Sequence, residues 1–158
     1  DVTTGSREVL LEDAPGNDCV VLARGDGYYT DPQNHKVWHV DSAGIRTLAD
    51  EGIERPNGLI TSPDQTLLWV ADSAGRFLYS FQIQPDGSLK YKQQYGHLHI
   101  GDEQLASGAD GMAVDSEGRV YVATNVGLQV LDQLGRVHLI LEKPQRGKLS
   151  NVVFGGPE

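Results

Sequence analysis

The stretch Arg55-Pro56-Asn57-Gly58-Leu59-Ile60-Thr61-Ser62-Pro63-Asp64 decides how the rest of the chain is interpreted. Its pattern predicts a turn, a short apolar strand and a second turn, and a second apolar strand follows over 67–71 and ends at Asp72. In an antiparallel pair of this kind, Asn57 and Asp72 lie at the same end of the sheet. We therefore expect polar side chains able to do chemistry to gather at that end.

The same unit occurs several times along the chain. Each copy begins with a polar residue that is followed by a short apolar run. The leading polar residues are Asn17, Asn57, Asp110 and Asn151. Successive copies are roughly 40–50 residues apart, a spacing typical of β-propellers in which one repeat forms one blade. In a propeller these leading residues would surround the mouth of the central channel.

The predicted fold is a single all-β domain over 1–158 that forms part of a six-bladed type of β-propeller. Complete blades are expected at 17–54, 55–105 and 108–143, and partial blades at 1–13 and 149–158. The expected strands include 8–12, 19–23, 27–30, 36–40, 45–49, 77–83, 89–94, 112–114, 120–123, 128–131, 137–141 and 151–154. The residues 96–107 are expected to form a loop at the channel mouth, where such loops often cover ligands.

Composition narrows the possible functions. The chain of 158 residues has 19 glycines and 7 prolines, which suits many turns and few helices. Its formal net charge of −9 argues against nucleic acid and anionic membrane surfaces as partners. No apolar run is long enough to span a bilayer. The single cysteine, Cys19, excludes an internal disulfide and is expected to be a small buried apolar residue of an inner strand.

Four motifs occur in one order with gaps the size of a blade. They are Tyr29-Thr30-Asp31-Pro32, Arg55-Pro56-Asn57-Gly58, Ala109-Asp110-Gly111-Met112 and Asn151-Val152-Val153-Phe154-Gly155-Gly156-Pro157. Together they resemble the SMP-30/gluconolactonase family, also called regucalcin-like, over nearly the whole chain. The resemblance implies a six-bladed propeller with one divalent cation in its channel, and lactone hydrolysis as the usual activity.

The resemblance also implies roles for particular residues. Asn57 matches a metal-ligand asparagine, and Asp110 matches an acid that is both metal ligand and general base. Asn17 with Asp18 resembles a pair near the bound substrate. The family's further ligand, a glutamate of the first blade, has no counterpart, and six blades would need about 250 residues or more. The resemblance therefore covers only the later blades of such a protein.

These residues predict a divalent-metal-dependent hydrolase of a sugar lactone or related cyclic ester. The metal would polarise the carbonyl, and Asp110 would accept a proton from the attacking water. Calcium is the expected cation, because it prefers oxygen ligands, with zinc, magnesium or manganese as alternatives. A simpler interpretation is that the Asn-Gly and Asp-Gly pairs are only turns between blades.

Two other classes of function stay open. The chain could be a non-catalytic propeller fragment that binds a ligand or a protein partner. It could also complete a propeller as a homodimer or with blades of a longer parent chain. A pair of histidines, His97 and His99, could face one side of a strand as in some zinc sites, although two solvated side chains are the simpler interpretation. Asp31 and Asp72 are expected to cap turns.

Overall fold

The computed structural model describes residues 3–6, 9, 11–12 and 14–156. Over these ranges the chain forms twelve β-strands in three separate four-stranded sheets and contains no helix. None of these residues therefore forms a helix long and apolar enough to cross a membrane. The chain is all-β, as the sequence predicts.

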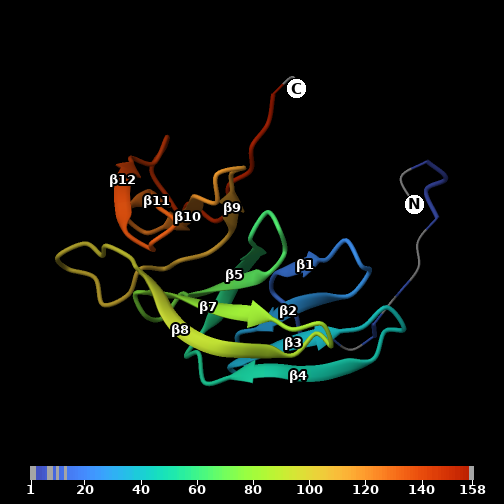
Figure 1. The fold of residues 1–158 in the computed structure, drawn as a ribbon. Helices are drawn as coiled ribbons and strands as arrows, with labels where there is room; N and C mark the ends of the chain where they lie inside the picture. The colour runs from blue at the N-terminus through green and yellow to red at the C-terminus, as the bar shows by residue number, and fades with distance from the viewer. Residues whose placement is uncertain (1–2, 7–8, 10, 13, 157–158) are drawn as a thin grey trace.

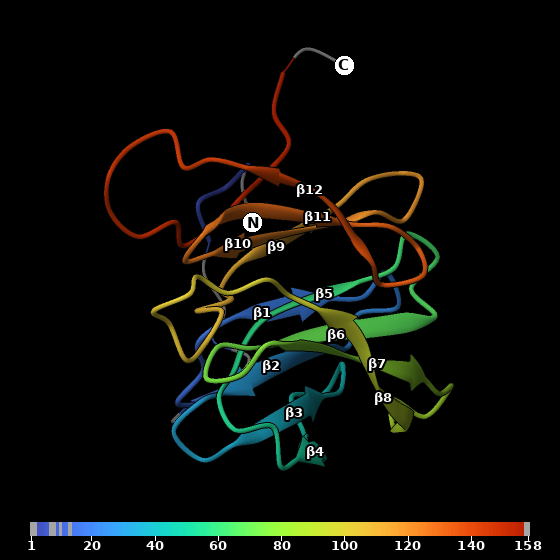
Figure 2. The same ribbon diagram turned by 90° about the vertical axis from the view of Figure 1, so that its left-hand side faces the viewer.

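The three sheets follow one another along the chain (Figures 1 and 2). The first contains β1 (Cys19–Val21), β2 (Gly27–Asp31), β3 (Lys36–Val40) and β4 (Arg46–Glu51). The second contains β5 (Pro56–Thr61), β6 (Leu67–Asp72), β7 (Phe77–Ile83) and β8 (Leu89–His97). The third contains β9 (Met112–Val114), β10 (Val120–Thr124), β11 (Gly127–Leu131) and β12 (Val137–Leu141). Every paired strand is antiparallel to its neighbour in sequence, which is the arrangement of a propeller blade.

Polar side chains of the connecting turns set where the strands reverse. In the turn between β9 and β10, one carboxylate oxygen of Asp115 accepts hydrogen bonds from the backbone N–H groups of Glu117 and Arg119, at 3.0 and 2.9 Å. Gly118 lies between them with a φ of 80°, a conformation that glycine adopts without steric cost. This turn chemistry explains why the strand positions could be read from the sequence.

The second sheet is covered on both faces, because side chains of β6 alternate between two cores. Leu68 and Val70 pack with residues of the first sheet that include Tyr28. Trp69 and Ala71 pack with residues of the third sheet that include Val122. Period-two alternation of a fully apolar strand therefore places the second sheet between the other two (Figure 2).

The first strand of each sheet lies beside the first strand of the next, so that β1, β5 and β9 form the inner side of the assembly (Figure 1). The N–H of Leu59 donates a 3.1 Å hydrogen bond to Asp18 Oδ2. A Cβ added to Gly58 would overlap the carbonyl oxygen of Asp110. Gly58, which has no side chain, thus allows the backbones of the second and third sheets to approach closely.

The strand predicted at 151–154 is not found. Residues 151–154 form no strand; within the described part of the chain, the backbone hydrogen bond to the inner side of the third sheet is made one residue earlier, from Gly111 N to Ser150 O (2.9 Å). Phe154 instead packs edge-on against Tyr121, with ring centroids 4.9 Å apart. The prediction at 8–12 falls partly on Glu8 and Leu10, which lie outside the described residues, and the other three positions are not in a strand.

Two smaller predictions also need correction. Cys19 is exposed, because it lies on the outward face of the first sheet and not on the face that packs against the second. The strand β8 continues to His97, three residues further than predicted, so the segment between the second and third sheets is shorter than 96–107 suggested. Gly96 permits this extension, since a Cβ there would overlap the side chain of Leu131.

A buried polar network joins the first sheet to the second at the end opposite Asn17 and Asn57. The carboxylate of Asp26 accepts hydrogen bonds from Arg24 Nε at 2.6 Å and pairs with His39 Nε2 at 2.7 Å. The hydroxyl of Tyr28 donates to the carbonyl oxygen of Gly87, in the turn between β7 and β8, at 2.8 Å. Burial alone would raise the pKa of Asp26, but the hydrogen bonds from Arg24 and His39 outweigh it and hold that pKa below its ordinary value.

Replacing Asp26 with asparagine is therefore expected to lower the free energy of unfolding by about 2–3 kcal/mol at pH 7, because bonds to a buried charged group are lost. A lowered pKa stabilises the fold above the ordinary pKa of an aspartate, and this contribution disappears as the pH falls through the lower folded value. Urea unfolding should show the largest difference from the original protein at pH 7, and this difference should shrink as the pH is lowered below the ordinary pKa of an aspartate. Asp102→Asn, at an exposed position, is the control, and a loss that does not change with pH would contradict the assignment.

Candidate metal and substrate site

The candidate site begins at a local irregularity in β5. The pairing of β5 with β6 is interrupted between Pro56 and Leu59, so Asn57 and Gly58 lie outside the regular ladder. Such bulges redirect side chains and are common next to functional sites. The carbonyl of Asn57 accepts a 2.7 Å hydrogen bond from the hydroxyl of Thr30 in the first sheet. Thr30 belongs to one of the motifs noted in the sequence but was assigned no role there.

The side chain of Asn57 presents an unsatisfied oxygen. The residue is 9% exposed, and its Oδ1 accepts no hydrogen bond from any residue that the structure describes. A buried polar atom without a partner costs about 1–3 kcal/mol. An amide oxygen is also one of the ligands that hard divalent cations prefer. The position of Asn57 Oδ1 is therefore suited to a bound cation.

The backbone of Asp110 packs against Gly58, the residue that follows this asparagine. Its backbone precedes β9 and is held by the hydrogen bond from its own N–H to the carbonyl oxygen of Ala123, at 2.9 Å. Its side chain is 14% exposed, and its Oδ2 lies 2.5 Å from Lys148 Nζ. The close backbone contact through Gly58 brings the Asn57 and Asp110 segments together at one end of two neighbouring sheets. Of the two residues predicted as ligands, Asn57 thus lies in β5, and Asp110 lies two residues before the neighbouring inner strand β9.

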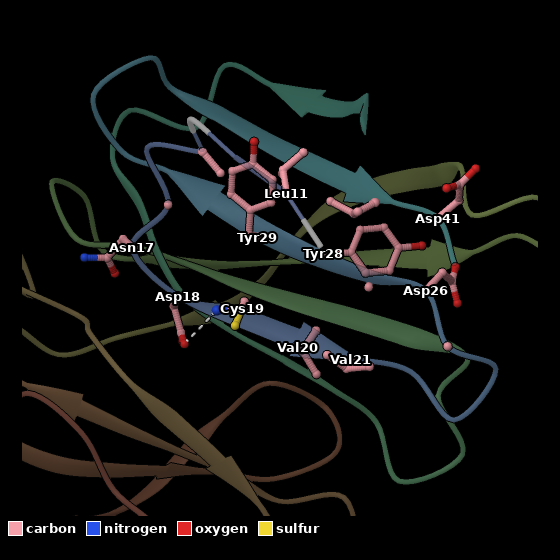
Figure 3. Close-up of a pocket in the computed structure, with 15 residues that line it drawn as sticks. Leu11, Asn17, Asp18, Cys19, Val20, Val21, Asp26, Tyr28, Tyr29 and Asp41 are labelled. Carbon is pink, nitrogen blue, oxygen red and sulfur yellow. Dashed lines mark hydrogen bonds between the residues drawn. The ribbon is translucent and has the colours of Figure 1, made fainter. Parts of the chain in front are cut away.

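Asn17 and Asp18 lie at the same end of the first sheet, before β1 (Figure 3). Asn17 is exposed. The carboxylate of Asp18 accepts hydrogen bonds from the backbone N–H of Cys19 at 2.9 Å and from that of Leu59 at 3.1 Å. Asp18 therefore also ties the first sheet to the second, a role that the sequence did not suggest.

A hollow of roughly 370 Å³ extends from Asn17 and Asp18 across the first sheet (Figure 3). Its lining includes Cys19, Val21 and Tyr29, and Asp26 and Asp41 lie at its far end. The hollow was not predicted, although the alternation of Cys19 with Val21 indicates an outward-facing apolar surface.

The other polar residues considered in the sequence either make hydrogen bonds within turns or are exposed. Asp72 Oδ1 accepts hydrogen bonds from the N–H groups of Arg55 and Ala74, at 3.0 and 3.1 Å. His97 is exposed and stacks on Phe77, and His99 is exposed as well. In the part of the chain that the structure describes, no three side chains of His, Cys, Asp or Glu are grouped to hold a metal. A cation at Asp110 would therefore need amide, carbonyl or water oxygens as further ligands.

Comparison with known proteins identifies the family of this chain. The sequence model of the SMP-30/Gluconolactonase/LRE-like region matches residues 10–158, and the chain belongs to this family. A gluconolactonase of Zymomonas mobilis is 26% identical over 181 residues, covering 98% of this chain and 51% of that protein. The pentonolactonase XacC of Haloferax volcanii is 24% identical over 136 residues, covering 82% of this chain and 44% of that protein.

Solved structures agree on the fold. A gluconolactonase of Xanthomonas campestris superposes with a TM-score of 0.72 at 24% identity, over 88% of this chain and 50% of the other. The calcium-binding protein regucalcin of Agrobacterium tumefaciens superposes with a TM-score of 0.74 at 23% identity, over 96% and 55%. The chain thus has the propeller fold of this family and spans about half the length of the relatives that it matches.

Proposed function

We propose that the chain carries part of the metal and substrate site of a hydrolase that acts on a sugar lactone or a related cyclic ester. The observation that supports this most directly is the buried Oδ1 of Asn57, which has no partner among the described residues, in a segment whose Gly58 packs against the backbone of Asp110. The names of the relatives, a gluconolactonase and a pentonolactonase, indicate the substrate class.

In this proposal Asn57 and Asp110 hold one divalent cation. Calcium suits their oxygen ligands best, and zinc, magnesium and manganese are alternatives. When bound, such a cation polarises the lactone carbonyl. The carboxylate of Asp110 accepts a proton from the water that attacks this carbonyl, and returns it to the ring oxygen as the ester bond breaks.

The substrate is proposed to lie against the first sheet. Asn17, whose amide is exposed, can donate to and accept from sugar hydroxyls. Each carboxylate oxygen of Asp18 already accepts one backbone hydrogen bond but keeps a second lone pair. Asp18 can therefore accept a substrate hydroxyl while it holds β1 beside β5.

Removal of metal tests this function. After treatment with a chelator, hydrolysis of a panel of five- and six-membered sugar lactones is expected to fall at least about 100-fold, and added calcium should restore it. Acid release in a lightly buffered indicator solution measures the rate. Asn57→Ala should weaken the response to calcium, whereas Asn34→Ala, in an exposed turn, should not. Full turnover in the chelator-treated protein would contradict a metal-dependent reaction.

A second candidate function is the completion of a propeller by two copies of the chain. The second sheet is covered on both faces, but the outward faces of the first and third sheets expose large apolar side chains. These include Val21 and Leu48 on the first sheet and Leu139 and Leu141 on the third. We propose that the outward face of the first sheet in one copy packs on that of the third sheet in another, which gives two equivalent contacts and closes the ring.

The 158-residue chain is therefore expected to be a dimer in light scattering at micromolar concentration. Leu48→Glu or Leu139→Glu should each convert it to a monomer, because a charge would be buried in the contact. Leu134→Glu, in an exposed turn, is the control. A stable monomer of the original chain would contradict closure by a second copy and would leave other propeller blades as the covering surface.

A further inference from the structure

The segment after β12 returns to the candidate metal site. Within it, Lys143 Nζ donates to the carbonyl oxygen of Gly147 at 2.8 Å, which closes a loop. Two residues after Lys148, the carbonyl oxygen of Ser150 accepts the hydrogen bond from Gly111 N. This anchor lies next to Asp110 in sequence, so the path of the backbone brings Lys148 to that carboxylate.

The resulting ion pair differs from an ordinary surface pair. Lys148 has 63% of its side chain exposed, but the Asp110 side chain is only 14% exposed. The 2.5 Å contact therefore joins a long, solvated ammonium to a carboxylate that is largely removed from water. Exposed pairs contribute almost nothing to stability, whereas a cation on a partly buried acid interacts more strongly because water screens it less.

The two proposed ligands are unequally satisfied in this arrangement. Asp110 has a positively charged partner, while Asn57 Oδ1 has none among the described residues. An ammonium group carries one charge and supplies only hydrogen-bond donors. The ammonium group of Lys148 is paired with the carboxylate of Asp110. A divalent cation could be coordinated by the carboxylate of Asp110 and the amide oxygen of Asn57 together. It would also repel an ammonium group on the same carboxylate.

From this geometry we infer that Lys148 is an internal counter-ion that occupies the cation position at Asp110 and must be displaced when a divalent cation binds. This inference rests on the proposed function, since it concerns the same acid. It makes Lys148 a residue that sets cation affinity and makes the 142–150 segment responsive to the cation. Binding of calcium and release of Lys148 are then two sides of one equilibrium, and each must affect the other equally.

Calcium titration by calorimetry on the full chain tests the inference without an activity assay. Lys148→Met is expected to bind calcium on the order of tenfold more tightly than the original protein, because the competing charge is gone. Lys148→Arg, which keeps the charge, should stay within about twofold of the original affinity. Arg146→Met, on the same loop, controls for the general loss of positive charge.

A chemical measurement checks the reciprocal effect. Saturating calcium is expected to increase the rate at which an acylating reagent modifies Lys148 several-fold, as followed by mass spectrometry, and to leave Lys90, an exposed lysine of β8, unchanged. Equal or weaker calcium binding by Lys148→Met would overturn the inference and leave the metal site itself standing. Absence of calcium binding in every variant would overturn both, so the two failures can be told apart.

Discussion

Replacement of Asp110 with asparagine is expected to lower kcat/KM for lactone hydrolysis by on the order of 10³-fold. An amide cannot accept the proton of the attacking water, and it supplies no negative charge to a cation. The fold should survive, because the backbone N–H of Asp110, and not its side chain, makes the hydrogen bond to Ala123. Steady-state kinetics with thermal unfolding of the same samples measures both quantities.

Two causes of this loss can be separated. If proton transfer dominates, activity stays low at saturating calcium, whereas a loss caused only by weaker cation binding is restored as calcium is raised. Asp102→Asn, at an exposed position, should keep full activity. Full turnover by Asp110→Asn at saturating calcium would remove Asp110 from the role of general base.

The second large effect is expected from Gly58→Ala. A methyl group at this position would overlap the backbone carbonyl oxygen of Asp110, which cannot rotate away as a side chain could. Relief requires β5 and the start of β9 to separate. Because overpacking against a rigid neighbour is costly, the free energy of unfolding should fall by about 3 kcal/mol, a large share of the stability of a typical domain.

The same substitution should also separate Asn57 from Asp110 and therefore weaken calcium binding. Urea unfolding and calcium titration measure the two effects on one protein. Gly155→Ala is the matched control, because a Cβ there meets no atom within 4 Å. If Gly58→Ala kept both the original stability and the original calcium affinity, the close approach of the two inner strands would not be what positions the site.

Most strands could be predicted from the sequence because turn residues mark where they begin and end. β3 (Lys36–Val40) and β7 (Phe77–Ile83) were predicted at the observed bounds. The prediction of a strand at 151–154 was wrong, because an apolar run forms a strand only where a neighbouring strand supplies its hydrogen bonds. Cys19 was assigned to the buried face for a similar reason, since alternation does not say which face has a neighbour.

The site could be predicted only in its outline. Asn57 and Asp110 are recognisable from their motifs and from their equal positions in the repeat, and the structure brings their segments together. The contact of Lys148 with Asp110 and the hydrogen bond from Leu59 to Asp18 are not visible in any local pattern. Both are tertiary contacts between residues far apart in the chain, and patterns of neighbouring residues do not predict such contacts.

The pairing of each strand only with its sequence neighbours has a consequence for how the molecule folds. Every hydrogen-bonded ladder closes a short loop, so the entropy lost in forming a sheet is small and the sheets can form rapidly and in any order. The contacts between β1, β5 and β9 join residues far apart in the chain and should form late. During refolding, strand content should therefore recover before the ability to bind calcium does.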